Sequence, residues 1–414
     1  MNAKKIIVVG AGPAGMMAAI QASQHTPDVI LIEKNPYPGR KLLLSGKGRC
    51  NLTNNCDLDS FIARFSGNGQ FLRDAFKKFF NQELIRFFED RHLSLKIERQ
   101  LRVFPETDKS DSVLEVLKKS LQKNKVKVFY KTAMKDILLK EDRVMGLLLL
   151  DGSFIAADKI ILATGGLTYS FTGSNGEGMK IAQGLGHHLV PVRPGLVPLE
   201  TKQQYPKILE GLALKNIRLN FCDGKRKIIS EIGELIFTDF GISGPLVLSL
   251  SGKIADWLSE NKSVYVEIDL KPALSKEQLE ARLFREFELN AKKTIKNTLK
   301  ALLPKKLVDV FLDLVKIMPE KKVSQIMRAE RQSIVSQLKA LRLDISRCRP
   351  LENAMITRGG VSLKEINSRT MESRLIKGLY FAGEMIDVDA DTGGFNLQAA
   401  FSTGYLAGES AAMS

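Results

Sequence analysis

KKIIVVGAGPAGMMAAIQASQ, residues 4–24, is the stretch of sequence that decides the fold. A short run of β-branched residues ends in a glycine turn, and an Ala- and Met-rich segment with helical spacing follows. Gly10, Gly12 and Gly15 stand in the G-x-G-x-x-G spacing that lets the backbone approach a pyrophosphate at a helix N-terminus. A second buried run ends at Glu33, where an acid can accept hydrogen bonds from ribose hydroxyls. This order of strand, turn, helix, strand and acid predicts a dinucleotide-binding β-α-β unit.

Two later strands distinguish an FAD domain from a simple NAD domain. KIILATGG (159–166) and GLYFAGEMIDVD (378–389) each have the pattern of a buried strand that ends in a glycine turn. Two-part FAD domains use such returning strands to reach the nucleotide and the ribitol chain, so we expect one FAD domain split by an insertion. DTGGFNLQAAFSTG (391–404) then predicts a last helix whose N-terminus faces the flavin pyrimidine and stabilises charge on the reduced flavin. The alternative is a glycine-rich helix cap with no ligand.

The length and the spacing of prolines predict where the insertion lies. A chain of 414 residues is long for a single core, so two or three domains are expected. Four prolines between residues 191 and 206 mark a boundary. Residues 195–270 are rich in strand patterns, and residues 274–343 have helical spacing. After Pro350 the pattern returns to a strand and a terminal helix. The aromatic residues of 70–90 recur at helical spacing, and we expect them in the core.

The net charge of the chain is concentrated in one segment. The whole chain carries +16, and residues 271–350 alone contain 19 basic and 9 acidic side chains, a net charge of +10. A localised basic field attracts polyanions, most often nucleic acid. The alternative is a solvated, lysine-rich helical face that only aids solubility.

Several classes of protein do not fit the composition. Four cysteines provide neither a disulfide framework nor metal-ligand spacing, which predicts a reducing cytoplasm and no metal. Four histidines make a zinc enzyme or a Ser-His-Asp enzyme a poor match. No apolar run reaches the roughly 20 residues that span a bilayer, and the N-terminal sequence lacks the pattern of a signal peptide. We therefore expect a cytoplasmic protein without a membrane partner.

The stretch GRKLLLSGKGRCNLTN, residues 39–54, places four cations and Cys50 among three glycines. Glycines allow a close approach of the backbone to a ligand, and the cations would offset the charge of a phosphate or of a reduced flavin. The alternative is a surface turn with spare charge.

This stretch and several others identify a family that the chain resembles. The others are GAGPAG, ATGG, TGSNGEGMKIAQGLGH, FTDFGISGPLVLSLS, TRGGV and GEMIDVDADTGGFNLQAAFSTG. Together they resemble the BaiN/RdsA family of FAD-dependent oxidoreductases, which includes aminoacetone-oxidase-like proteins. The resemblance implies an α/β fold, in which a glutathione-reductase-type FAD-binding Rossmann domain carries an inserted small β-barrel with a helical insert. The implied domains are 1–190 with 351–414 for FAD, 191–273 with 344–350 for the barrel, and 274–343 for the basic helices.

The motifs and the resemblance assign residues to FAD and to catalysis. Arg40 and Lys41 are expected at the pyrophosphate or ribose, and the SGKGRCN loop at the reactive face of the flavin. NAD(P)H, as a transient reductant, would bind at the flavin itself, with Arg358 of TRGGV completing the pocket. The residues assigned to FAD are Gly10, Gly12, Pro13, Ala14, Gly15, Glu33, Lys34, Arg40, Lys41, Ser45, Gly46, Gly48, Arg49, Asn51, Thr164, Gly165, Gly166, Gly383, Glu384, Asp387, Gly393, Gly394, Phe395 and Asn396.

Cys50 allows three interpretations. It is a buried bystander, or a general acid whose thiol pKa is lowered by the neighbouring Arg49. In the third, Cys50 and Cys56 form a redox disulfide, which their C-x5-C spacing disfavours, since glutathione reductase has C-x4-C. The expected catalytic residues are therefore Cys50, Arg49 and Arg358.

Three functions remain open from the sequence. The first is an FAD-dependent reductase of an activated C=C bond that forms dihydrouridine in 23S ribosomal RNA, since family members are associated with that reaction. Residues 271–350 would then contact RNA phosphates, and the target base would be presented unstacked. The second is a small-molecule flavoenzyme, an enone reductase or an amine oxidase. The third is a flavoprotein that binds RNA or ribosomes without catalysis. The sequence does not predict the oligomeric state.

Overall fold

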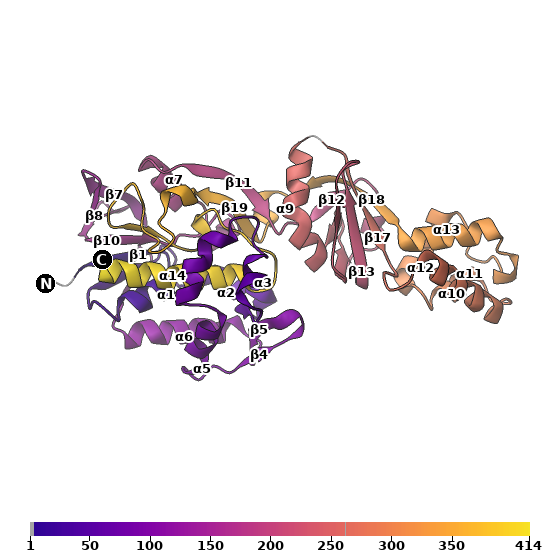
Figure 1. The fold of residues 1–414 in the computed structure, drawn as a ribbon, viewed down its shortest axis with the longest axis horizontal. Helices are drawn as coiled ribbons and strands as arrows, with labels where there is room; N and C mark the ends of the chain where they lie inside the picture. The colour runs from indigo at the N-terminus through magenta and orange to yellow at the C-terminus, as the bar shows by residue number, and fades with distance from the viewer. Residues whose placement is uncertain (1–3, 261) are drawn as a thin grey trace. The chain divides into compact units, whose positions relative to one another are not determined.

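The protein, described here by a computed structural model of residues 4–260 and 262–414, divides into two compact units (Figure 1). The first combines Met1–Gly195 with Leu351–Ser414, and the second is Leu196–Pro350. The chain therefore leaves the first unit and returns to it. The predicted fold class, a Rossmann-type domain with an inserted β-barrel that carries helices, is confirmed.

A five-stranded parallel sheet forms the centre of the first unit. Its strand order is β20-β10-β1-β2-β6, and each neighbouring pair runs parallel. Strands of this kind are buried on both faces, which explains why they consist almost wholly of Ile, Val and Leu. The carboxyl ends of parallel strands share one edge, and ligands bind there in folds of this type. The strands are β1 (Ile6–Val9), β2 (Val29–Ile32), β6 (Lys127–Phe129), β10 (Lys159–Leu162) and β20 (Leu379–Phe381).

Helices cover this sheet. The C-terminal helix α14 packs along α1, the helix that opens the dinucleotide motif, and α6 packs on the other side of α1 (Figure 1). The predicted terminal helix is thus present, and a strand far along the chain completes the first sheet. The helices of this unit are α1 (Pro13–Ala22), α2 (Arg40–Leu44), α3 (Leu58–Ile62), α4 (Arg73–Lys78), α5 (Asn81–Glu89), α6 (Ser110–Lys123), α7 (Glu177–Gly184) and α14 (Phe395–Met413).

Three smaller sheets complete the first unit. The prediction that aromatic residues of 70–90 lie in the core is confirmed for Phe76, Phe79 and Phe88, which are at most 5% exposed. Phe88 packs against Phe401 of α14, with ring centroids 6.0 Å apart. The strands of the smaller sheets are β3 (Thr53–Asn54), β4 (Leu95–Ile97) and β5 (Arg102–Pro105); β7 (Met134–Lys140), β8 (Arg143–Leu149) and β9 (Phe154–Ala156); and β11 (Leu189–Gly195) with β19 (Ile356–Val361).

A closed barrel forms one part of the second unit. Six strands pair in the ring β13-β15-β16-β12-β18-β17, and β17 pairs with β13 to close it, while β14 adds to β13 from outside. Closure leaves the ring without a free edge. The strands are β12 (Leu199–Thr201), β13 (Ala213–Cys222), β14 (Lys227–Ile229), β15 (Gly233–Phe237), β16 (Gly241–Ser243), β17 (Val264–Asp269) and β18 (Leu341–Cys348).

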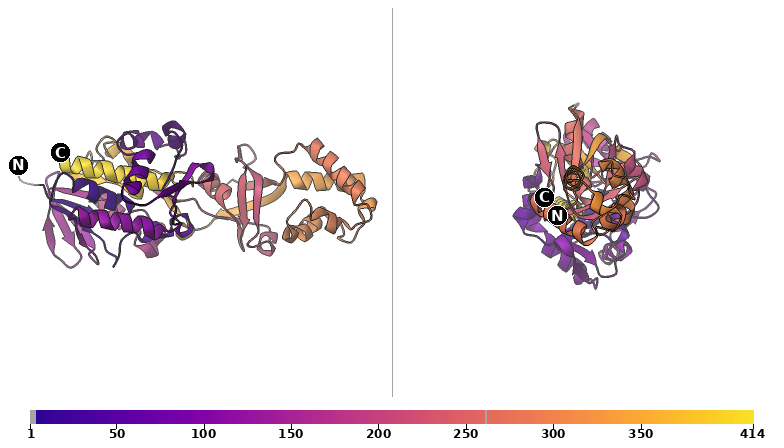
Figure 2. Two further views of the ribbon diagram at one scale, coloured as in Figure 1. Left: turned by 90° about the horizontal axis from the view of Figure 1, so that it is seen from below. Right: turned by 90° about the vertical axis from the view of Figure 1, so that its right-hand side faces the viewer.

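Helices α10–α13 lie at one end of this barrel and share its hydrophobic core (Figure 2). At the seam, Lys339 of α13 and Asp269 of β17 form an ion pair that is largely buried, with side chains 14% and 11% exposed. The helices of this unit are α8 (Tyr205–Ile208), α9 (Pro245–Ser259), α10 (Lys276–Leu289), α11 (Ile295–Leu299), α12 (Lys305–Val315) and α13 (Arg328–Lys339).

One element in the strand-rich segment differs from the prediction. PLVLSLS begins the helix α9, although residues 195–270 were expected to be rich in strands. Pro245 occupies the first helical turn, where its fixed φ and missing N–H are tolerated. Val247, Ser251 and Ile254 then face the barrel core at helical spacing. A short apolar run is compatible with a helix or a strand, and here the packing of this segment on the barrel favours the helix.

Candidate cofactor-binding and active site

The carboxyl edge of the parallel sheet brings most of the predicted FAD residues together. The turn after β1 holds the glycine motif, and Glu33 follows β2. Thr164, Gly165 and Gly166 follow β10, and Gly383 with Glu384 follows β20. Four strands far apart in the sequence thus deliver their predicted residues to one edge, at the place where the topology predicts a ligand.

The turn between β1 and α1 has the shape of a dinucleotide cradle. Gly10 adopts a φ of +101°, and a Cβ built there would lie 2.6 Å from the carbonyl oxygen of Ala163. Gly12, by contrast, is extended, with φ −81° and ψ −177°, and a Cβ there would meet no atom within 4 Å. Gly12 therefore leaves open space directly at the N-terminus of α1, and no side chain caps this helix end. Such an end attracts a phosphate.

A second observation also fits FAD. The Asn51 side-chain oxygen is buried, and it has no hydrogen-bond partner among residues 4–260 and 262–414. Buried polar atoms in proteins nearly always have partners, so an orphaned acceptor inside a predicted site indicates a donor from a ligand. The open cradle at Gly12 and this orphaned acceptor both suit a dinucleotide that carries phosphates and N–H or O–H donors. FAD fits the residues present.

Glu33 stands where the ribose-binding acid is expected. Glu33 is 8% exposed, and its carboxylate accepts hydrogen bonds from the backbone N–H of Ala11 (2.8 Å) and from both the backbone N–H (2.9 Å) and the side-chain amide (2.6 Å) of Asn35. A carboxylate has about four acceptor positions, so about one remains for a ribose hydroxyl. Lys34 instead points to the 172–178 loop, where its ammonium contacts Asn175 and Glu177 (2.8 Å).

Lys41 connects the segments that follow β10 and β20. Its ammonium donates to the hydroxyl of Thr168 at 2.7 Å and pairs with the carboxylate of Glu384 at 2.5 Å. The other oxygen of Glu384 accepts from the backbone N–H of Thr357 at 2.8 Å. All these groups are partly or fully buried, so the network holds one charged pair at the edge of the sheet. Arg40, next to Lys41, donates to the side chain of Asn35 (2.7 Å).

The SGKGRCN loop forms a tight turn with unusual backbone angles. Two residues other than glycine, Lys47 (φ +59°) and Cys50 (φ +62°), are left-handed here. Side chains rarely adopt this conformation, and it is concentrated at functional sites. The Ser45 hydroxyl donates to the carbonyl of Leu42, and the Ser45 carbonyl accepts from the N–H of Cys50 (3.0 Å).

The structure corrects the electrostatic argument for Cys50. Its side chain is 0% exposed, and burial raises the pKa of the thiol to about 12, although a hydrogen bond with Ser45 acts in the opposite direction. The expectation that Arg49 lowers this pKa is wrong. Cys50 and Cys56 are both free thiols in this structure. Whether Cys50 takes part in catalysis stays a prediction.

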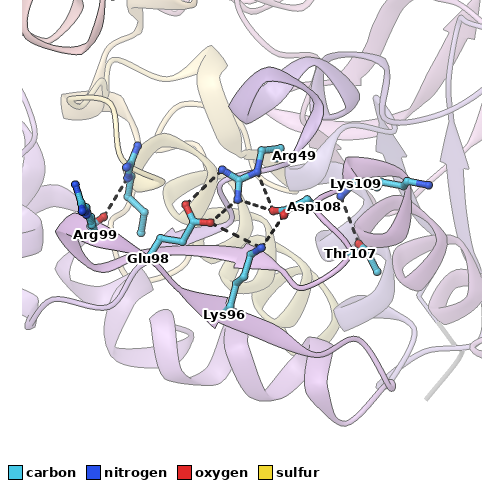
Figure 3. A network of polar contacts seen from close by, with 8 residues as sticks. Arg49, Lys96, Glu98, Arg99, Thr107, Asp108 and Lys109 are labelled. Carbon is cyan, nitrogen blue, oxygen red and sulfur yellow. Dashed lines mark hydrogen bonds and ion pairs between the residues drawn. The ribbon is translucent and has the colours of Figure 1, made fainter. Parts of the chain in front are cut away.

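The Arg49 guanidinium is occupied by carboxylates, as Figure 3 shows. It contacts Glu98 at 2.5 Å and Asp108 at 2.5 Å, and it lies 4.2 Å from the centre of the Phe104 ring. Lys96 joins the same network through Asp108 at 2.6 Å. These contacts lower the pKa of Glu98 and of Asp108 and raise that of Arg49. Arg49 thus faces the β4–β5 hairpin, and the sequence alone does not indicate this contact.

A second polar cluster lies around TRGGV. Arg358 of β19 is 18% exposed, and its Nε is 3.6 Å from the carboxylate of Asp389. Asn68 donates to the carboxylate of Asp387 at 3.0 Å. Burial, and then the negative charge of Asp389, raise the pKa of Asp387. A carboxyl with a raised pKa near a cation is a candidate for proton transfer.

The residues predicted at the start of α14 serve the local structure. Gly394 precedes the helix, Phe395 lies in the aromatic core, and the side chain of Asn396 both accepts from and donates to the backbone of Ala390. Their side chains are therefore engaged within the protein, and only backbone groups of this helix start are available to a ligand.

Residues that sequence reasoning missed now belong to the site. Thr168 and Thr357 hold the Lys41–Glu384 pair, while Glu98 and Asp108 hold Arg49. Thr357 begins the TRGGV motif, but nothing in the sequence indicates its partner Glu384, which is distant along the chain. No quoted motif includes Thr168, Glu98 or Asp108, so no signal identified them. Within the described ranges, no cluster of His, Cys, Asp and Glu is arranged to hold a metal ion. No helix of the described chain is long and apolar enough to cross a membrane.

Comparisons with known proteins agree with this site. Residues 4–410 match the family model described as HI0933-like protein Rossmann domain. The chain is 33% identical over 411 residues to a 3-dehydro-bile acid delta(4,6)-reductase of Clostridium scindens, and the match covers 99% of each chain. It is 31% identical over 410 residues to a ribosomal RNA dihydrouridine synthase of Escherichia coli, with 96% of each chain covered.

Solved structures share the fold at lower identity. A 3-ketosteroid delta1-dehydrogenase of Sterolibacterium denitrificans aligns over 100% of both chains with a TM-score of 0.54 and 12% identity. A quinol-fumarate reductase aligns over 99% of this chain and 71% of its own, with a TM-score of 0.52 and 20% identity. At such identities the comparison concerns the fold alone.

Proposed function

The chain belongs to the HI0933-like (BaiN/RdsA) family of FAD-dependent oxidoreductases, and we propose that it reduces uridine to dihydrouridine in 23S ribosomal RNA. The relative from Escherichia coli and one from Haemophilus influenzae, 30% identical over 404 residues, are both named ribosomal RNA dihydrouridine synthases. Both matches cover 96% of this chain, so they include the second unit as well as the cofactor unit.

The reaction needs one hydride and one proton. Reduced FAD, when bound, would supply the hydride to one carbon of the uracil 5,6 double bond, and the other carbon would take a proton, which would convert the double bond to a single bond. The Cys50 thiol is protonated at neutral pH but enclosed, whereas the half-buried carboxyl of Asp387 has a raised pKa and lies close to Asp389 and Arg358. Comparing Cys50→Ala with Asp387→Asn in a single turnover would separate these two donors.

The observation that carries the RNA hypothesis is the free positive charge of the helical insert. Many of its cations are exposed and form no ion pair within the described parts of the chain. Such cations would contact phosphates and release counterions. A substrate without phosphates would leave them unused. The residues are Arg285, Lys292, Lys293, Lys305, Lys316, Lys322 and Arg328.

We also propose that NAD(P)H reduces the flavin by binding transiently at it, because no second glycine motif of the G-x-G-x-x-G type follows a strand in this sequence. The protein would work in the cytoplasm, where ribosomal RNA is present. A stopped-flow measurement of flavin bleaching with NADH and with NADPH would identify the reductant.

The decisive experiment compares cells with and without the gene. Dihydrouridine in purified 23S ribosomal RNA, measured by nucleoside mass spectrometry, is expected to disappear in the deletion strain. It should return with the wild-type gene and not with a variant that fails to bind FAD. An unchanged level, in cells that contain the nucleoside in this RNA, would contradict the proposal.

A second candidate is the reduction of a small conjugated enone. It rests on the relative with the name 3-dehydro-bile acid delta(4,6)-reductase, whose identity of 33% exceeds that of the RNA-modifying relatives. Turnover of steroidal or other enones by the purified holoenzyme, together with an absence of binding to ribosomal RNA, would favour this candidate.

A further inference from the structure

The first unit carries its own group of free cations next to the SGKGRCN loop. We call the surface made by Lys47, Arg99, Arg102 and Lys109 the basic lip. Lys47 belongs to the loop, and Arg99 lies in the turn between β4 and β5. Arg102 is the first residue of β5, and Lys109 directly precedes α6. Lys47, Arg99 and Lys109 are exposed, and Arg102 is half-buried.

Two of the four acids in this region are already paired with cations outside the basic lip. Glu98 and Asp108 pair with Arg49 and Lys96, so these two carboxylates and two cations form a locally neutral network (Figure 3). The four cations of the basic lip form no ion pair among the residues that the structure describes; Arg102 donates only to the carbonyl of Arg99 (3.1 Å). The four lip cations outnumber the two remaining acids of this stretch, Glu106 and Asp111, so the lip keeps an excess of positive charge.

The basic lip is fixed to the loop that holds Asn51. The backbone N–H of Leu52 donates to Val103 (2.9 Å), and β3 pairs with β5. Arg49 lies over the ring of Phe104 on β5, at 4.2 Å. The loop and the hairpin thus form one body, and the lip keeps its place relative to the orphaned acceptor of Asn51.

Apolar side chains stand between these cations. Ile97 is 54% exposed and Leu101 is 46% exposed, on the same hairpin as Arg99. Cations interleaved with exposed apolar groups suit a nucleic acid strand, whose phosphates meet the cations while an unstacked base or a sugar meets the apolar groups. The phosphates of FAD are not candidates for this surface, because their cradle lies at Gly12, after β1 in the parallel sheet.

We propose that the basic lip binds the RNA phosphates that flank the reduced nucleotide. This inference rests on the proposed function, and it places RNA contacts in the cofactor unit in addition to those expected of residues 271–350. The lip would hold the strand beside the loop, so that the target base can leave its stack and enter the site.

The test uses the FAD-loaded enzyme and the double variant Arg99→Glu/Lys109→Glu, because both cations are exposed and lie outside the cofactor loop. The matched control is Lys119→Glu/Lys123→Glu, which changes the charge equally at two exposed cations near the end of α6. Affinity for protein-free 23S ribosomal RNA is measured across a range of salt concentrations. Loss of two phosphate contacts should reduce the slope of log affinity against log salt by about 1.4 to 1.8, and the control should keep the wild-type slope. Bound FAD and its reduction by NAD(P)H should be unchanged in both variants.

Each outcome decides between defined alternatives. If wild-type enzyme binds and modifies RNA but the lip variant keeps the salt slope of the control, the inference is overturned and the proposed function stands. If wild-type enzyme neither binds ribosomal RNA nor forms dihydrouridine, both fail together. If the lip variant loses binding to anionic lipid vesicles and keeps binding to RNA, the lip is a membrane contact and the inference is again overturned.

Discussion

Replacing Gly12 with valine should weaken FAD binding and leave the folded protein intact. The backbone at Gly12 is extended, which any residue adopts, and a Cβ there meets no atom within 4 Å. The same open space is where we expect the pyrophosphate at the N-terminus of α1. The substituted side chain therefore collides with the ligand and with no part of the protein.

The size of the effect follows from the cost of overpacking. Forcing extra methyl groups into a filled site costs about 1–3 kcal/mol, which weakens binding roughly 5- to 150-fold. Gly10→Val is the contrasting variant, because its Cβ would lie 2.6 Å from the carbonyl of Ala163 at a φ of +101°. A left-handed side chain alone costs roughly 1–2 kcal/mol, so this variant should lower the free energy of unfolding even without FAD.

Two measurements on the FAD-free protein separate these effects. Urea unfolding gives the stability of the fold, and fluorescence titration with FAD gives the dissociation constant. Gly184→Ala in α7, another position with no atom within 4 Å, serves as the neutral control. If Gly12→Val binds FAD as tightly as wild type does, the assignment of the pyrophosphate to the β1–α1 turn is refuted.

Three further predictions concern other buried groups. Burial lowers the pKa of His187 below its ordinary 6.5, so the unfolded chain binds the proton more readily than the folded protein does. The free energy of unfolding should therefore fall as the pH drops below about 6.5, and His187→Gln should lose this pH dependence in urea unfolding. Cys50 should resist thiol reagents in the native protein while exposed thiols react, because its sulfur is enclosed; mass mapping of labelled peptides would show it. Asp269→Asn should cost about 1–3 kcal/mol of unfolding free energy, since it leaves the ammonium of Lys339 buried without its carboxylate, whereas Asp309→Asn at an exposed pair should cost under about 1 kcal/mol.

The fold of the first unit could be predicted because its signals are local. A β-branched run, a glycine turn, a helical segment and an acid at the end of the next strand follow each other within 30 residues of chain. The final strand and helix have the same clear patterns, and β20 pairs with β10 as a returning strand. The helix α9 was missed because its apolar run is equally compatible with a strand, and only the barrel against which it packs decides.

The candidate site was predicted in position but not in its polar contacts. Lys41 and Glu384 are 343 residues apart in sequence, and Arg49 and Glu98 are 49 apart. A cation in a sequence motif could pair with many different carboxylates of the chain, depending on the fold. Only the topology decides which carboxylate lies close to it. The error at Cys50 has the same origin. Arg49 is its neighbour in sequence, but the left-handed turn at Cys50 buries the thiol while the guanidinium reaches the hairpin.

The chain leaves and re-enters the first unit through two paired strands. The exit strand β11 and the return strand β19 pair antiparallel, with Gly195 opposite Ile356, so both ends of the insertion lie side by side. An insertion with adjacent ends can change in sequence without disturbing the sheet that holds the dinucleotide. Relatives that match nearly the whole chain at similar identity have names that refer to a bile acid and to ribosomal RNA. On this argument, differences in substrate should be sought in the second unit and at the basic lip, and not at the carboxyl edge of the parallel sheet.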